Sequence, residues 1–279
     1  MKAFHENRLY RSSFPVQAGR VRNISFLAHW HNDVELVYVR EGAIRMGINS
    51  ETRMLRQGDL AVCSSGDIHF YDSREQESEI LLLIFPPQLV GAPGGWPRDL
   101  WLKEPFLCST AEADDVEPPV LAVRLGEMMH EIEQEIAAKA SQYELVVTGL
   151  LHELCGLTLR YAQPAPADEQ RDKRRMVHRK TMQTVFDWLE AGYMHPVTLE
   201  DAAERAGMSL FYFSRTFKSI AGMNFLTYLN TIRVHKAEEL ILTTDSTILD
   251  IALECGFTNV RTFNRVFRQI RGCSPSSLR

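Results

Sequence analysis

The sequence predicts a two-domain α+β protein, with a β-rich N-terminal domain followed by helices and an all-α C-terminal domain. Three observations predict this class. Short apolar runs give way to a helical period near residue 119, a charged segment without apolar period occupies 163–175, and the C-terminal region contains an internal repeat. A chain of 279 residues, 45 % hydrophobic and 24 % charged, has ordinary globular composition and can bury two cores.

Residues 20–90 are expected to form the strands. The apolar runs LVYV, IRMGI, MLRQGDLAVC and EILLLIF are followed by the turn signals EG, NS, SSGD and PP respectively. Strands this short and this evenly punctuated are typical of a sandwich or a barrel.

Two amphipathic helices are expected after the strands. The first carries apolar residues at roughly helical spacing, namely Val120, Val123, Met128, Ile132 and Ile136. The second has an apolar face made of Tyr143, Val147, Leu150, Leu151, Leu154 and Leu157. Consecutive helices of this kind often pack as a hairpin. They either form a dimer face or only cover the β domain, and the sequence leaves both interpretations open.

Charge is distributed unevenly along the chain. From Lys173 onward there are 15 Lys and Arg against 10 Asp and Glu, whereas residues 1–172 hold 16 basic and 26 acidic residues. Unless this sorting is accidental, only the C-terminal part is expected to meet a polyanion. Five widely spaced cysteines without a CxxC pair, and no signal-peptide or membrane-spanning pattern, favour a cytoplasmic location.

Residues 198–222 and 247–272 are two copies of one unit. Four positions recur 49 residues later and five more, after one inserted residue, recur 50 residues later: Thr198, Asp201, Ala203, Gly207, Phe213, Arg215, Phe217, Ile220 and Gly222. In each copy a Thr followed by an Asp predicts a capping box, and a glycine ends the short helix. Ser209 or Asn259 then begins a second helix.

The second helix of each copy is expected to be amphipathic and basic. Phenylalanines recur at i, i+4, and the opposite face carries Arg215 and Lys218, or Arg261, Arg265 and Arg268. Helix, glycine turn and basic helix predict a helix-turn-helix; a protein-binding repeat is the alternative, although two copies are too few for a solenoid. Between the copies, residues 224–242 predict a helix of roughly 30 Å, close to the length of one turn of B-DNA.

Four signatures in residues 176–279 carry a resemblance to a known family. They are LEDAAERAGMS with YFSRTFK, the R…A…L pattern, ILDIALECGF, and a C-terminal pattern that ends at Gly272, Ser274, Pro275 and Arg279. This part resembles the DNA-binding domain of the arabinose-regulator (AraC/XylS) family of bacterial transcription factors. Arg261, Thr262 and Leu278 depart from the usual family residues. The first two bear on which bases are read.

Residues 20–90 in turn resemble the cupin-like sensor barrel that many such regulators carry. The first motif is His29-x-His31-x3-Glu35-x6-Gly42, and the second is Gly58-x5-Ser64-x-Gly66-x2-His69, with Ser64 where proline is usual. The resemblance implies an N-terminal cupin-like β-barrel whose His29, His31, Glu35 and His69 bind a small-molecule effector, a sugar or a related metabolite. In metal-binding cupins these four residue types are the ligands, so a divalent metal stays open as an alternative and no other cofactor is expected. A structural role at the barrel mouth is the third interpretation of these residues.

The whole chain is therefore interpreted as a transcription regulator and not as an enzyme. Residues 1–162 are assigned to sensing and dimerisation, 163–175 to a linker and 176–279 to DNA binding. One alternative is a metal-binding cupin enzyme, or a regulator that responds to a metal. Another is a DNA-binding protein whose barrel only dimerises. A homodimer is expected, and RNA polymerase is left open as a further partner.

The residues expected to contact double-stranded DNA lie near the start of each second helix. By resemblance they are Phe211, Ser214 and Arg215 in the first unit and Val260, Arg261, Asn264 and Arg265 in the second. Arginine can pair with guanine, asparagine with adenine, and Phe or Val can touch a thymine methyl group. The alternative for Arg215 and Arg265 is a phosphate contact that positions the protein without specifying sequence.

Overall fold

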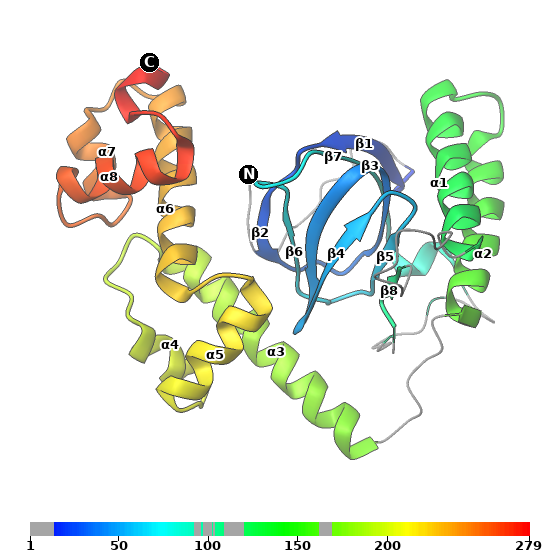
Figure 1. Cartoon of the computed structure of the whole chain (residues 1–279), viewed down its shortest axis with the longest axis horizontal. Helices are drawn as coiled ribbons and strands as arrows, with labels where there is room; N and C mark the ends of the chain where they lie inside the picture. The colour runs from blue at the N-terminus through cyan, green and yellow to red at the C-terminus, as the bar shows by residue number, and fades with distance from the viewer. Residues whose placement is uncertain (1–13, 92–95, 97–101, 103, 109–119, 162–168) are drawn as a thin grey trace. The chain divides into compact units, whose positions relative to one another are not determined.

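The computed structural model describes the chain except for residues 1–13, 92–95, 97–101, 103, 109–119 and 162–168. Its described part divides into two compact units, one ending at Arg179 and the other running from Lys180 to Arg279 (Figure 1). The first is rich in strands and the second is entirely helical, which confirms the expected two-domain α+β class.

The N-terminal unit is built on an eight-stranded antiparallel sheet. Its strands are β1 (Gln17–Arg22), β2 (Phe26–His29), β3 (Val34–Ile48), β4 (Glu51–Arg56), β5 (Leu60–Cys63), β6 (His69–Asp72), β7 (Ser78–Phe85) and β8 (Phe106–Leu107). The main path runs β1-β7-β3-β5-β8, while β2 pairs with β6, and β4 and β6 pair with β3. Within the described residues no pairing joins β1 to β8, so the cupin-like sheet is not a closed barrel.

Strand β3 connects the two halves of this sheet. Its first half pairs with β5 and β7, and its second half pairs with β4 and β6. The sequence predicts a turn at Glu41 and Gly42, and this prediction is wrong: the register only shifts between Val39 and Glu41. The strand continues because β7 pairs with it as far as Gly42 and β4 takes over at Ala43, so ladder hydrogen bonding does not stop.

Helices α1 (Val120–Ala138) and α2 (Tyr143–Tyr161) cover one face of the sheet. Leu36 and Leu83 from the strands pack in one core with Leu125 and Leu151 from the helices. The other face of the sheet encloses a second core, which includes Val37, Ile44, Met46 and Ile80. Both expected helices are confirmed. Val120, however, is 81 % exposed, because the buried stripe of α1 starts at Ala122.

The linker expected at 163–175 is partly helical. Residues 169–175 form the beginning of α3 (Glu169–Gly192), and residues 163–168 lie outside the described residues. Strong helix formers and the absence of Pro and Gly from 169 to 191 explain the helix. None of the described helices has the length and apolarity needed to span a membrane.

The C-terminal unit contains the two repeated copies. The first consists of α4 (Leu199–Arg205) and α5 (Leu210–Ala221), the second of α7 (Ile248–Glu254) and α8 (Val260–Arg271), and the unit ends in a 3₁₀ turn at Pro275–Leu278. Helix α6 (Phe225–Thr243) lies between them and serves both. Its Tyr228 packs edge-to-face against Phe217 of α5, while its Val234, Ala237 and Ile241 join the core of the second copy.

Candidate functional site

Both repeated units begin with a capped helix. The Thr198 hydroxyl accepts a hydrogen bond from the Asp201 amide at 3.1 Å, and the Asp201 carboxylate accepts one from the Thr198 amide at 3.0 Å. In the second unit the Thr247 hydroxyl accepts from the Asp250 amide at 3.1 Å, but the carboxylate bonds to the Thr247 hydroxyl instead of its amide. The first capping box is therefore complete, and the second is half formed.

A left-handed glycine turns each first helix toward its second helix. Gly207 has φ +62° and Gly256 has φ +82°, as the sequence predicts for the position after the helix end. The next caps are also those expected: Ser209 accepts from the Tyr212 amide and Asn259 from the Thr262 amide. The sequence thus encodes equivalent caps and glycine turns in both units, which present α5 and α8.

Helix α5 presents an exposed stripe on the side opposite its aromatic core. Phe213 and Phe217 are buried, while Phe211, Ser214, Arg215 and Lys218 are exposed. Phe211 is 79 % exposed, which is unusual for a residue of this size unless the surface has a partner. The three residues that the sequence assigns to DNA contact in this unit therefore share one accessible face.

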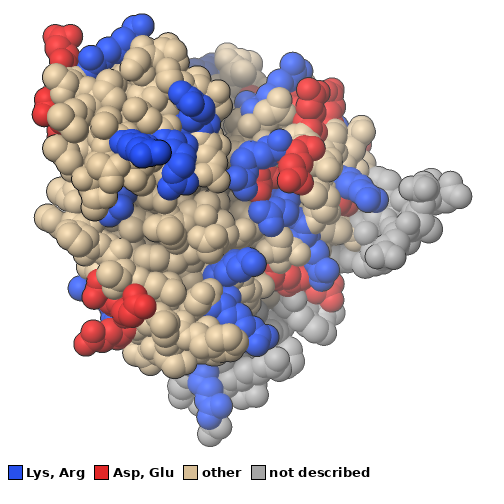
Figure 2. Space-filling model, turned by 60° about the vertical axis from the view of Figure 1, so that its left-hand side comes forward, with Lys and Arg blue, Asp and Glu red and all other residues tan. Residues whose placement is uncertain are grey.

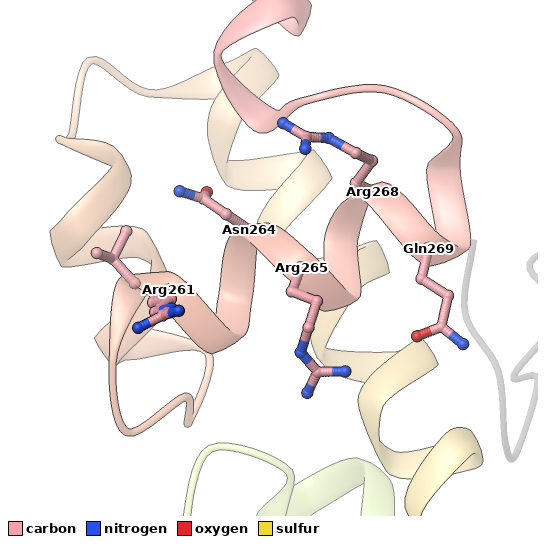
Figure 3. Close-up of a pocket in the computed structure, with 6 residues that line it drawn as sticks. Arg261, Asn264, Arg265, Arg268 and Gln269 are labelled. Carbon is pink, nitrogen blue, oxygen red and sulfur yellow. The ribbon is translucent and has the colours of Figure 1, made fainter.

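Helix α8 presents the matching stripe, with more positive charge. An open depression of about 640 Å³ is lined by Val260, Arg261, Asn264, Arg265, Arg268 and Gln269. All the labelled side chains in Figure 3 project from this one helix. The four residues assigned to DNA contact lie together here. Arg268 and Gln269 were not among them, although their helical spacing from Arg261 and Arg265 was a signal that could have identified them.

The positive charge on these two stripes is not neutralised from within the described part of the protein. No described acidic side chain forms an ion pair with Arg215, Lys218, Arg261, Arg265 or Arg268. Neither α5 nor α8 contains an acidic residue. Figure 2 shows several separate groups of Lys and Arg side chains on the visible face, with Asp and Glu side chains beside some of them. Such cations are available to phosphates and to guanine edges.

A buried arginine fixes the second unit against the chain that precedes the first. Arg233 of α6 donates from Nε to the Tyr193 carbonyl oxygen at 2.8 Å and from Nη2 to the His195 carbonyl oxygen at 3.0 Å. Its guanidinium also lies 5.8 Å from the centre of the Phe257 ring. Burial lowers the pKa of Arg233, but arginine stays charged at any physiological pH. In the sequence Arg233 is the arginine of the R…A…L signature, and that pattern does not reveal which groups the side chain contacts.

The N-terminal unit brings its four predicted site residues together inside the folded sheet. His29 ends β2, His31 follows it, Glu35 lies near the start of β3, and His69 begins β6 directly opposite His29. All four are at most 2 % exposed. One ring nitrogen from each histidine lies within 4.8 Å of the other two.

Hydrogen bonds to the backbone orient the three imidazoles. The Nδ1 atom of each ring lies 2.9–3.1 Å from a carbonyl oxygen: His29 from Leu27, His31 from Asp33 and His69 from Asp67. A carbonyl oxygen only accepts, so Nδ1 carries the proton and a neutral ring keeps a lone pair on Nε2. The Nε2 atoms of His31 and His69 face the interior of the unit.

The Glu35 carboxylate faces these nitrogens. Its Oε2 lies 3.0 Å from His31 Nε2 and its Oε1 lies 3.8 Å from His69 Nε2, while the Tyr71 hydroxyl donates to Oε1. Burial alone would raise the pKa of Glu35, but His31 and His69 hold it well below its usual range. Burial, together with the other two imidazoles, holds the pKa of His29 well below its usual value. The group therefore combines a carboxylate with at least one neutral imidazole.

Comparison with known families finds matches over both units. Residues 13–154 match the family model of the AraC-like ligand binding domain, and residues 202–279 match that of a helix-turn-helix domain. The transcriptional activator RhaS of Yersinia pestis is 27 % identical over 279 residues, which span 96 % of this chain and 94 % of RhaS. The uncharacterised transcriptional regulator YdeC of Bacillus subtilis is 24 % identical over 89 % of this chain and 84 % of its own.

Solved structures similar to this chain fall into two groups. The DNA-binding domain of AdpA, in complex with a target DNA, is 32 % identical and covers 35 % of this chain and 87 % of its own, with a TM-score of 0.34. ToxT of Vibrio cholerae, with an unsaturated fatty acid bound, is 12 % identical over 96 % of each chain, with a TM-score of 0.43.

Proposed function

The chain belongs to the AraC family of transcription regulators, and on this premise we propose that α5 and α8 read DNA bases under the control of a ligand bound in the N-terminal unit. Family membership makes the chain a DNA-binding transcription regulator with a ligand-binding domain. The observation that carries the base-reading proposal is the pair of exposed stripes. Arg215 and Arg265 lie 50 residues apart at equivalent positions of the two second helices, each unpaired within the described residues.

The position of each side chain on its helix suggests its role. Residues in the first turns of a recognition helix reach base edges. Arg215 and Arg265 suit guanine, Asn264 suits adenine, and the exposed Phe211 suits a thymine methyl group. Lys218 and Arg268 lie one turn further along, where a positive charge suits the phosphate backbone.

Selection from a pool of randomised duplexes tests this assignment. Arg215→Ala should remove the preference at one base pair and Arg265→Ala at another about one helical turn away, each weakening the selected site by about 1–3 kcal/mol. Arg268→Ala is the matched control: it should weaken all sequences alike and lower the salt slope by about one unit. If both arginine variants keep the wild-type preference and bind all duplexes more weakly, they contact only phosphate.

The ligand is proposed to bind at the four-residue group of His29, His31, Glu35 and His69. Two facts support this: ring nitrogens of the three buried histidines lie within 4.8 Å of one another and face the Glu35 carboxylate, and the family's ligand-binding domain spans all four residues.

A homodimer is also proposed. Helix α2 covers the sheet with one face and exposes Leu145 (70 %) on another, so a second copy of the chain would cover that apolar surface. Sedimentation of the whole chain tests the dimer: the wild type should sediment as a dimer and Leu145→Glu as a monomer.

A further inference from the structure

One aspartate holds the turn that precedes strand β6. The Asp67 amide donates to the Ser64 carbonyl oxygen at 3.0 Å, and the Asp67 carboxylate accepts from the Ser64 amide at 2.9 Å. Asn49 donates to the same carboxylate, also at 2.9 Å. The Asp67 carbonyl oxygen accepts from Nδ1 of His69 at 3.0 Å. A displacement of the His69 ring therefore acts first on Asp67.

The Asp67 carboxylate also pairs with an arginine of α3. Arg179 donates from Nη1 to Asp67 Oδ1 at 3.0 Å, and the two side chains are only 10 % and 6 % exposed. Opposite charges that are shielded from water attract each other more strongly than exposed ones, and separating them leaves each charge buried without its partner. The pair therefore resists separation, and a shift of Asp67 acts on Arg179.

Helix α3 continues beyond Arg179 into the C-terminal unit. The N-terminal unit ends at Arg179, and Lys180 begins the other. Seven residues after Arg179, or about 10 Å along a helix, Phe186 is buried. Its ring centre lies 5.3 Å from that of Phe217 on α5 and 5.3 Å from that of Tyr228 on α6. No Pro or Gly interrupts α3 between Arg179 and Phe186, so this stretch contains no residue that favours a kink.

We propose that the Arg179–Asp67 ion pair transmits a change at the ligand site to the DNA-reading helix α5. The series of contacts, called the relay below, consists of His69, Asp67, Arg179 and Phe186. The inference rests on the proposed function, because it names the route by which a ligand at the four-residue group would alter DNA binding. It gives a regulatory role to Asp67 and Arg179, which the sequence motifs did not assign to any site.

A double-mutant cycle tests the relay without requiring the ligand, because His69→Ala alters the ligand site directly. This substitution should change the affinity for a duplex selected by the wild-type protein about tenfold. In the Arg179→Met background it should change that affinity by less than about twofold, because methionine keeps an apolar stem but cannot pair with Asp67. Arg179→Lys should restore the tenfold effect.

The matched control for this cycle is Arg174→Met, which removes an exposed arginine from the same helix. In that background His69→Ala should act as it does in the wild type. A tenfold effect that persists in Arg179→Met would overturn the relay, and so would the absence of any effect in the wild type. The proposed function is judged separately: a wild-type protein that selects no sequence from randomised duplexes would contradict base reading.

Amide hydrogen exchange in the absence of DNA supplies a second measurement. His69→Ala should lower the protection of α3 residues 182–189 about tenfold and leave that of α1 unchanged. In the Arg179→Met background it should cause no further loss. Protection of β3 and β7 at the wild-type level shows that the sheet of each variant is folded. Unchanged protection of α3 in His69→Ala would overturn the relay, whatever happens to duplex affinity.

Discussion

The two helix-turn-helix units have equivalent capping and turn residues, but they pack against different parts of the chain. In each unit a threonine caps the first helix (Thr198, Thr247), and a left-handed glycine follows its end (Gly207, Gly256). A polar residue then caps the second helix (Ser209, Asn259). The first unit, however, packs on an aromatic cluster made of Phe186, Phe213, Phe217, Phe225 and Tyr228. The second packs on α6 beside a buried Arg233 and carries most of the arginines. Local sequence therefore determines the backbone conformation of each copy. The packing partners determine how much a substitution at each position changes the free energy of unfolding.

The glycine turns should show the largest difference between the units. A Cβ on Gly207 would meet nothing within 4 Å, so Gly207→Ala should cost only the left-handed strain of about 1–2 kcal/mol. A Cβ on Gly256 would lie 2.8 Å from the carbonyl oxygens of Tyr193 and Met194. Gly256→Ala should therefore lose about 3–4 kcal/mol of unfolding free energy, because overpacking adds to the strain. Urea unfolding of the whole chain measures both, and equal losses would contradict the difference in context.

Lowering the pH should reduce the stability of the second unit more than that of the first. Burial, reinforced by Arg271 and opposed by Glu238, lowers the pKa of His235 on α6 to about 4. Between pH 6.5 and 4 the unfolded chain binds a proton that the folded unit resists, so stability falls as the pH is lowered through this window. With allowance for partial exposure, the loss is about 2 kcal/mol.

Amide hydrogen exchange, corrected for its intrinsic pH dependence, separates the two units in this experiment. Protection in α7 and α8 should fall between pH 6.5 and pH 4 by more than protection in α4 and α5. His235→Gln is the control, and it should abolish that difference. Equal loss of protection in both units would show that His235 does not set their acid sensitivity.

Substitution of the capping threonines should show the smallest difference in stability between the two units. Each threonine hydroxyl accepts an amide hydrogen bond at 3.1 Å, so Thr198→Ala and Thr247→Ala should each cost about 1 kcal/mol, measured as the free energy of unfolding. Serine at either position should restore the stability. A much larger cost at one threonine would mean that its methyl group, and not its hydroxyl, matters there.

The sequence predicts those elements whose conformation is determined by nearby residues in the chain. Capping residues, left-handed glycines and a 49-residue offset predicted the helices of both copies, and the two motifs HxHxxxE and GDIH predicted which side chains would meet inside the sheet. It failed at Glu41 and Gly42, because a turn signal and a bulge within a long strand have the same residues. It also left Arg268 and Gln269 out of the residues expected to contact DNA, and it gave no contacts for Arg233. The partners of Arg233 come from distant parts of the chain.

Nor could the pattern give the protonation of the histidines. The HxH motif indicates only that the two imidazole rings lie on the same face of a strand. Their tautomers depend on the carbonyl oxygens of Leu27, Asp33 and Asp67, which become neighbours through local backbone geometry.

Because α5 and α8 both pack on the single helix α6, the proposed reading of DNA by both helices requires a fixed interval between the two contacted segments. One base pair inserted between them would shift the second segment by about 3.4 Å and rotate it by about 34–36°. A continuous helix without Pro or Gly cannot follow that rotation. Target sites in a genome should then vary in their bases far more freely than in the number of base pairs that separate the two contacted segments.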